Sequence, residues 1–303
     1  MKMHFNRYLC ATALCAGLSV SAAAAPSAED ASPATNGTGV PLSSLKSAWE
    51  KVRAGTPVSQ KGAPAKPGSC LVVIDPGHYA DYGAGTYDTG ATSSVNKLKE
   101  TTVIDSVAGT LAGQVFKDTG CAVTFTRLPG QPYPYNPGLR DRKANREESL
   151  RGRARFAYAL QETMAIEQMI FISLHANTHG NLRGGEVFVD STTTKKEGPP
   201  TRAQSVNLAK KIAASYRTPA APTTVHTDNF HVLDECDSLS LQTRKSLNGC
   251  VLLEMGYLDH PQEARYLAQI AKNPEPAARK IAQGIAAYRN ETAAPPPAKL
   301  AFR

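Results

Sequence analysis

The sequence of 303 residues lacks the features that mark several common classes of protein. After residue 25 no segment is long and apolar enough to cross a membrane, so we expect no stable membrane insertion. Basic helices and basic motifs interleaved with aromatic residues are also missing, which argues against nucleic acid as a partner. Without internal repeats, and with a hydrophobic fraction of 41%, the chain is expected to be a globular protein with its own core.

Two chemical motifs are absent as well. There is no G-x-S-x-G segment, the turn that presents the serine nucleophile of many hydrolases. No pair of cysteines has the C-x-x-C spacing of a cysteine metal site. A serine or cysteine nucleophile is therefore disfavoured, and we interpret the cysteines as structural.

The first 25 residues have the pattern of a secretory signal peptide. Lys2 and Arg7 supply positive charge, residues 8–20 form a short apolar stretch, and residues 21–25 are small enough for a cleavage site. We therefore expect an exported protein, located in a periplasm or secreted. Loss of the two basic residues lowers the formal net charge from +8 to +6 (8 − 2 = 6), and a basic exported protein suits an anionic substrate such as a cell wall.

Composition divides the rest of the chain. Residues 26–69 are expected to be a disordered linker, except for a short amphipathic helix near 42–54 whose apolar residues recur at helical spacing. The compact domain is expected at 70–290, and the proline-rich residues 291–303 are expected to be a loose tail.

Removal of the signal peptide leaves four cysteines, Cys70, Cys121, Cys236 and Cys250. An even number in an oxidising compartment predicts two disulfides. Cys70 and Cys121 each open a predicted strand, while Cys236 lies in the predicted loop before the strand that Cys250 opens. Of the three possible connectivities we favour 70–121 and 236–250.

Strand and helix patterns alternate through the domain, which predicts an α/β fold. The long polar segment 128–150 is interpreted as a loop that either faces the substrate or is simply solvated. Apolar or alternating runs predict strands at 71–74, 121–126, 169–174, 185–190, 230–233 and 250–254. Helical spacing predicts helices that begin near residue 100 and at 151–164, 201–216, 262–270 and 277–288.

Four ionisable side chains stand at strand ends or at a helix start. His78 follows the Pro-Gly turn after the first strand, His175 follows the strand 169–174, and Glu254 closes the last strand. Glu100 lies in the first turn of its helix, on the same side as the apolar stripe. A carboxylate there is either paired or metal-bound, or it is a wetted acid favoured by the helix N-terminus.

In a sheet with this alternation the four positions gather at one edge. Two histidines and a carboxylate form a catalytic zinc set that leaves the fourth position open for water, and the remaining carboxylate can be the base for that water. His179, four residues after His175, is not expected to be a ligand, because the preceding strand and Gly180 argue against a helix there.

Four ordered segments carry a family resemblance: Val73–His78, Asp88–Ala91 running into Leu98–Glu100, Ile172–Asn177 and Leu252–Tyr257. They resemble the zinc-dependent N-acetylmuramoyl-L-alanine amidases, specifically the catalytic domain of the family that includes the bacterial cell-division amidases. The resemblance implies a single α/β domain with a mostly parallel or mixed six-stranded sheet and helices on both faces. It also implies one Zn²⁺ per chain, held by His78, Glu100 and His175, with Glu254 as the catalytic acid/base.

The activity implied is hydrolysis of the amide between N-acetylmuramic acid and the L-alanine of the peptidoglycan stem peptide. For substrate contact we choose Asn177, Arg127 and Arg153. The alternatives are a non-catalytic cell-wall binding protein of the same fold and a zinc carboxypeptidase acting on stem peptides. Peptidoglycan is the expected partner, and the sequence identifies no regulatory protein. Tyr79 and Tyr257 depart from the usual family residues, on loops expected to contact substrate, while the metal set stays intact.

Overall fold

A computed structural model of the chain describes the region that the sequence assigns to the compact domain. The described residues are 70–79, 87–131, 133, 142–164, 166–179, 181–191, 200–243 and 247–292. The predicted signal peptide, the linker with its helix near 42–54 and residues 293–303 lie outside them. Residues 291 and 292, which were expected to begin the loose tail, are instead the end of a helix.

The described strands form one mixed sheet. They are β1 (Cys70–Pro76), β2 (Ala122–Phe125), β3 (Gln168–Asn177), β4 (Glu186–Asp190), β5 (Thr224–Asp228) and β6 (Cys250–Tyr257). Their order in the sheet is β2-β1-β3-β6-β4-β5. Paired strands run parallel, except that β4 is antiparallel to β6. The predicted six-stranded α/β fold is therefore confirmed.

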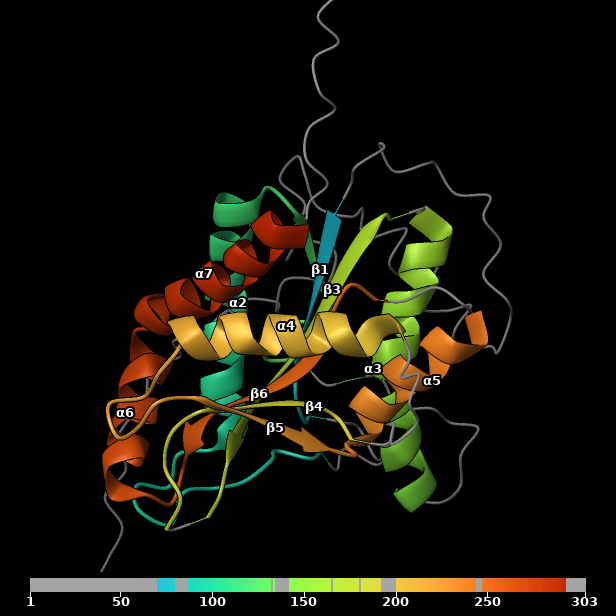
Figure 1. The fold of residues 1–303 in the computed structure, drawn as a ribbon. Coiled ribbons are helices and arrows are strands. Elements are labelled where there is room, and N and C mark those ends of the chain that lie inside the picture. The colour runs from blue at the N-terminus through green and yellow to red at the C-terminus, as the bar shows by residue number, and fades with distance from the viewer. Residues whose placement is uncertain are drawn as a thin grey trace, which may run out of the picture. The chain divides into compact units, whose positions relative to one another are not determined.

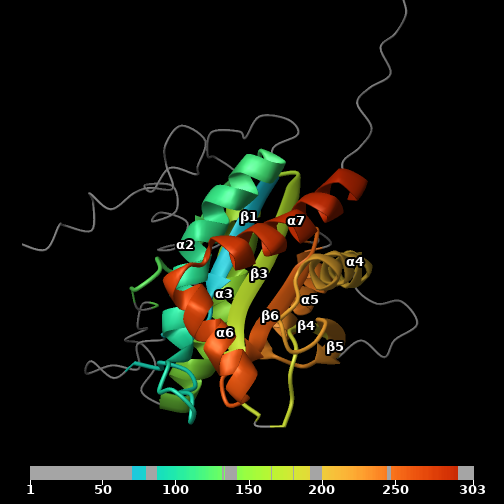
Figure 2. The same cartoon turned by 90° about the vertical axis from the view of Figure 1, so that its left-hand side faces the viewer.

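Helices cover both faces of the sheet. The described helices are α2 (Glu100–Thr119), α3 (Arg142–Met164), α4 (Pro200–Ser215), α5 (His231–Thr243), α6 (Pro261–Lys272) and α7 (Glu275–Thr292). Apolar residues of α2, α4, α6 and α7 share one core cluster, and those of α3 and α5 share a second. Figure 1 shows α3 and α5 on the opposite side of the sheet from α2, α6 and α7, and Figure 2 shows α2 and α7 lying beside each other over β1 and β3.

The central strand β1 shows how the sequence produces this layering. All seven of its residues are buried. Val72 and Ile74 belong to the first cluster, whereas Leu71 and Val73 belong to the second. Successive side chains of a strand point to opposite faces, so a strand covered by helices on both faces needs an unbroken apolar run. The parallel strands β1, β3 and β6 also bring their carboxyl ends to one edge of the sheet, where ligands bind in such folds.

Two predicted elements were wrong. Residues 230–233 are not a strand, because α5 begins at His231, and the fifth strand is β5 at Thr224–Asp228. This strand lies at the edge of the sheet and is almost entirely exposed, so its sequence carries no apolar signal. The segment 128–150 is not one long loop, because α3 begins at Arg142. Its first turns are mostly charged and hide the helical period.

Both predicted disulfides are present. Cys70–Cys121 joins the beginning of β1 to the residue before β2, with 4.9 Å between the Cα atoms. Cys236–Cys250 has 6.5 Å between the Cα atoms and ties α5 to the first residue of β6. Cys236 lies inside α5 and not in the loop expected from the sequence, because the helix extends from His231 to Thr243.

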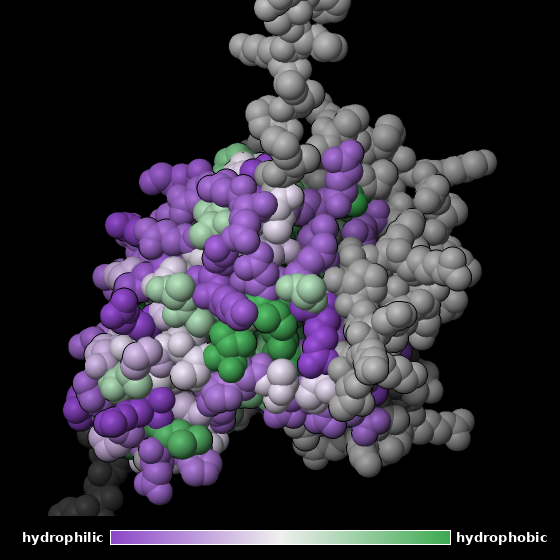
Figure 3. Space-filling model, in the orientation of Figure 1, coloured by the Kyte–Doolittle hydropathy of each residue, from purple (hydrophilic) through white to green (hydrophobic). Residues whose placement is uncertain are grey.

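One face of the molecule is largely polar (Figure 3). On the face shown in Figure 3, most of the coloured residues are hydrophilic, and the hydrophobic ones gather in a small group near the centre. Of the helices described, none combines the length and the hydropathy that a membrane crossing requires.

Candidate metal centre and active site

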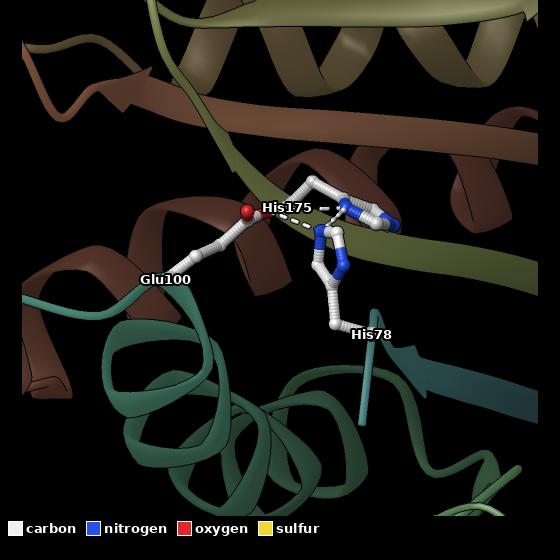
Figure 4. A group of neighbouring side chains, drawn as sticks. All are labelled: His78, Glu100 and His175. Atoms are coloured by element: carbon white, nitrogen blue, oxygen red, sulfur yellow. Dashed lines mark hydrogen bonds and ion pairs between the residues drawn. The ribbon is translucent and has the colours of Figure 1, made fainter. Parts of the chain in front are cut away.

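Three side chains from three different elements converge on one point. His78 follows the end of β1, Glu100 is the first residue of α2, and His175 lies in β3 (Figure 4). His78 Nε2 lies 2.9 Å from Glu100 Oε1, and His175 Nδ1 lies 3.1 Å from the same oxygen. The two ring nitrogens are 3.2 Å apart. Within the described part of the chain, this is the one group of at least three His, Cys, Asp or Glu side chains able to share a metal ion.

The donor atoms of this cluster fit a tetrahedral metal ion. Bonds of about 2.0–2.2 Å from Zn²⁺ to nitrogen and oxygen place neighbouring ligands of a tetrahedron about 3.3–3.5 Å apart. The three separations of 2.9, 3.1 and 3.2 Å are only slightly shorter. Two imidazole nitrogens and one carboxylate oxygen are also the donor types that catalytic zinc sites use. The predicted set His78, Glu100 and His175 is therefore able to bind a metal.

His78 is oriented by its backbone and by Asp88. Its φ angle is 56°, in the left-handed region that costs a residue with a side chain ~1–2 kcal/mol. Asp88 Oδ2 lies 3.1 Å from Nδ1 of His78, which leaves Nε2 to face the cluster. A carboxylate on the second ring nitrogen is the usual partner of a metal-binding histidine. Gly90 is required beside this pair, because a Cβ there would lie 2.9 Å from His78 Cδ2 and 2.6 Å from Glu100 Oε2.

Glu100 is a buried carboxylate at the start of α2, only 3% exposed. Its Oε1 accepts a hydrogen bond from the backbone N–H of Ala176, and its Oε2 accepts one from Ala91, both at 2.9 Å. Burial alone would raise the pKa of Glu100, but the hydrogen bonds with His175 and His78 hold it well below its ordinary value. The alternative of a wetted acid at the helix end is therefore wrong.

The two histidines have different environments. For His78, burial acts to lower the pKa, but the hydrogen bonds with Asp88 and Glu100 raise it to about 10. For His175, burial is the largest influence and lowers the pKa, which favours the neutral ring. Gly77 packs against this ring, since a Cβ there would lie 2.3 Å from His175 Nε2. His179 is exposed and lies outside the cluster, as predicted.

Glu254 lies beside the ligands rather than among them. It pairs with His175 in the register of β3 and β6, and on its other side with Glu186 of β4. The side chain is 7% exposed, and its Oε2 has no hydrogen-bond partner among the described residues. Burial and the negative charge of Glu100 raise the pKa of Glu254 well above its ordinary value. Such a carboxylate readily takes up a proton, as a general base must.

The sequence suggested that His175 and Glu254 stand at the ends of their strands, but both strands continue beyond them. β3 continues to Asn177 and β6 to Tyr257, and the strand pairing resumes there after an irregularity. The ladder hydrogen bonds therefore hold the backbone on both sides of each functional residue.

A cavity of about 680 Å³ opens over this edge of the sheet. Its lining includes the cluster and Glu254, residues of α3, and the segment 228–232, which leads from the end of β5 into α5. Asn177, predicted to contact substrate, also lines it. Its side-chain nitrogen lies 3.4 Å from Glu186 Oε2, which also accepts a hydrogen bond of 2.5 Å from the hydroxyl of Tyr257.

Arg127 and Arg153, the two arginines predicted to contact substrate, are both buried. Their residues are 4% and 1% exposed, and both guanidinium groups donate to carbonyl groups of the segment 76–78. Arg153 lines the cavity, so its contact with substrate stays a prediction, whereas Arg127 is not among the lining residues.

Sequence reasoning missed Asp88 and Glu186. Asp88 lies in the segment Asp88–Ala91, so its position in that motif was a usable signal. Glu186 carried none, because a polar residue in an alternating strand is ordinary.

Fold and site together fit a class: α/β hydrolases with a three-residue cluster able to bind a metal and a carboxylate beside it. Within this class, the family model described as N-acetylmuramoyl-L-alanine amidase matches residues 72–287, and the chain belongs to that family. The protein is a peptidoglycan amidase, which hydrolyses the amide between N-acetylmuramic acid and L-alanine of the stem peptide. Curated protein sequences contain no match to the chain.

Solved structures share the fold. An N-acetylmuramoyl-L-alanine amidase from Clostridium difficile 630 is 21% identical, with a TM-score of 0.52 over 74% of this chain and 99% of that one. The amidase Ami1 from Mycobacterium smegmatis is 17% identical, with a TM-score of 0.51 over 73% and 97%. The CwlD amidase from Clostridioides difficile, solved with the GerS lipoprotein, is 19% identical, with a TM-score of 0.52 over 73% and 98%.

Proposed function

We propose that the amidase uses one Zn²⁺ per chain, held by His78, Glu100 and His175, and that Glu254 is its general acid and base. The observation that carries the proposal is the position of Glu254 next to the three clustered ligands, with an unpartnered buried oxygen. The metal would polarise the scissile carbonyl and lower the pKa of the attacking water.

Glu254 would carry out both proton transfers of the reaction. Glu254 takes a proton from the attacking water and later gives it to the nitrogen that leaves with L-alanine. The carbonyl carbon gains the water oxygen as its bond to that nitrogen breaks. The products are a free lactyl carboxylate on N-acetylmuramic acid and a stem peptide with a new amino terminus. Asp88 keeps Nε2 of His78 directed at the ligand cluster throughout.

The substrate would lie in the cavity above the sheet edge, with Asn177 contacting it. We also infer that the protein is exported, with residues 1–25 as signal peptide and 26–69 as linker before the catalytic domain at 70–290. Two disulfides support this location, because disulfides persist in oxidising compartments.

Digestion of purified sacculi with the exported protein tests the reaction. The amidase should release peptides that begin with L-alanine and leave glycan chains with free lactyl carboxylates. Stems shortened at their carboxyl ends would identify a zinc carboxypeptidase instead, and binding without any release would identify a non-catalytic wall protein. Metal content measured on the same preparation should be one zinc per chain, and full activity in protein stripped of metal would contradict the proposal.

A further inference from the structure

Two arginines hold the backbone that leads to His78. Three successive carbonyl groups, those of Pro76, Gly77 and His78, accept hydrogen bonds from them. Arg127 donates from Nε to Pro76 at 2.9 Å and from Nη2 to Gly77 at 2.8 Å. Arg153 donates from Nη1 to Pro76 at 2.9 Å and from Nη2 to His78 at 2.6 Å. The segment 76–78 therefore depends on two side chains from elsewhere in the chain.

The contacts fix the peptide planes on both sides of the His78 Cα. The carbonyl of Gly77 belongs to the plane before this atom and the carbonyl of His78 to the plane after it, so the two hydrogen bonds together restrain φ and ψ of His78. His78 and Tyr79 have φ angles of 56° and 57°, which residues with a side chain rarely adopt by themselves. Such a conformation persists only where the surrounding structure imposes it.

Arg153 connects this segment to the strand of the second histidine. Its Nη1 lies 2.6 Å from Asp75 Oδ1, and both side chains are 1% exposed. The other carboxylate oxygen of Asp75 accepts a hydrogen bond of 2.6 Å from the hydroxyl of Ser173. Ser173 lies in β3, two residues before His175, and pairs with Asp75 in the sheet. The positions of His78 and His175 are thus coupled through one buried ion pair.

Arg127 connects the same segment to the helix of the third ligand. Its Nη2 lies 2.8 Å from Asp105 Oδ1, and the arginine side chain is fully buried. Asp105 belongs to α2, the helix whose first residue is Glu100. Arg127 also packs over the ring of Tyr79, with 5.3 Å between its Cζ atom and the ring centroid. Each arginine therefore bridges the His78 segment and an element that carries another ligand.

We propose that Arg127 and Arg153 are positioning residues for the metal centre, which set the backbone of His78 relative to Glu100 and His175. This inference rests on the proposed metal site. Both residues act through carbonyl groups of the main chain. The task requires several N–H donors in one plane, which a guanidinium has and an ammonium group lacks. Substitution of arginine by lysine therefore keeps the positive charge and removes the planar set of N–H donors.

The test measures zinc affinity on the full chain carrying Arg153→Lys. The control is Arg155→Lys in the same helix α3, where the arginine pairs with Glu235 at 2.7 Å. Dissociation constants come from competition with a chelator of known affinity, and thermal unfolding of the metal-free proteins is recorded in parallel. Outer partners of metal ligands typically change metal affinity about 10–100-fold, so we expect a loss of this size for Arg153→Lys and none for the control.

The outcomes separate this inference from the proposed metal site. A folded Arg153→Lys protein with the dissociation constant of the wild type overturns it, even if its unfolding temperature is lower, because a purely structural role would give that result. An equal loss in the Arg155→Lys control also overturns it. If Arg153→Lys does not fold, Arg127→Lys carries the same expectation in the same assay. Wild-type protein that binds no zinc would instead refute the metal site itself.

Discussion

His175 and Glu254 occupy paired positions of neighbouring strands, β3 and β6. Side chains at paired positions lie on the same face of a sheet, so a carboxylate stands beside a metal-ligand candidate without joining the ligand cluster. Hydrogen bonds of the ladder fix this spacing better than a loop could. In the proposed mechanism the two residues therefore have different roles, which substitutions can separate.

Glu254→Gln should lose turnover and keep the metal. The glutamine preserves the shape of the side chain but cannot accept the proton of the attacking water. General acid–base help is worth ~10²–10⁴-fold, so we expect a fall in sacculus hydrolysis of at least this order. Glu275→Gln, at a largely exposed position of α7, serves as the control and should be unchanged. A Glu254→Gln protein without metal would mean that Glu254 is a ligand.

Removal of a metal ligand should lower the amount of bound metal as well as turnover. His78→Ala, Glu100→Ala and His175→Ala each delete one of the clustered donor atoms, so bound metal and hydrolysis should fall together. His179→Ala is the matched control, because this histidine is exposed and only four residues from His175. Metal content by elemental analysis decides the matter. Stoichiometric zinc in an active Glu100→Ala protein would break the three-ligand assignment.

The two disulfides should differ in what their loss affects. In the chain-entropy model a loop of 51 residues is worth about 4 kcal/mol and one of 14 residues about 3 kcal/mol. Replacing Cys70 and Cys121 by alanine should therefore lower the unfolding temperature more. Replacing Cys236 and Cys250 should lower activity more, because Cys250 begins the strand that carries Glu254. Thermal unfolding and sacculus hydrolysis of both double variants test this, and the reverse ranking of activities would contradict it.

Much of the fold was predictable because burial leaves a pattern in the sequence. β1 is covered on both faces and is apolar throughout, and Glu100 was conspicuous on the apolar side of its helix. The edge strand β5 and the first turns of α3 left no such pattern. One is exposed, and the other is mostly charged, so neither has the periodicity that reveals an element.

The site was predictable where the residue type itself is chemically unusual for its position. His78, Glu100, His175 and Glu254 were found because ionisable groups rarely follow or interrupt apolar runs. The roles of Arg127 and Arg153 could not be found in this way, because their partners are backbone carbonyl groups and the contacts span up to 77 positions of the chain. Local sequence does not encode which main-chain groups a distant arginine will meet.

A pair of buried carboxyl groups outside the metal-ligand cluster should make the stability of the folded protein depend on pH. Asp237 of α5 lies near Asp190 at the end of β4, and both are buried. Burial and then the neighbouring Asp190 raise the pKa of Asp237 to about 7. In the unfolded chain an aspartate has a pKa of about 3.9. Between this pH and about pH 7 the folded protein therefore holds a proton that the unfolded chain has released. Stability should therefore fall as the pH rises from about 4 to about 7.

Asp237→Asn should remove this dependence, because an amide has no proton to lose. We expect the unfolding temperature of the variant to exceed that of the wild type at about pH 8, and this advantage to vanish at about pH 3, where Asp237 is largely protonated in both states. Asp118→Asn, at an exposed position of α2, is the control and should show no such divergence. Thermal unfolding of the three proteins across this range measures the effect. Parallel curves for wild type and Asp237→Asn would show that Asp237 ionises in the folded protein as it does in the unfolded chain.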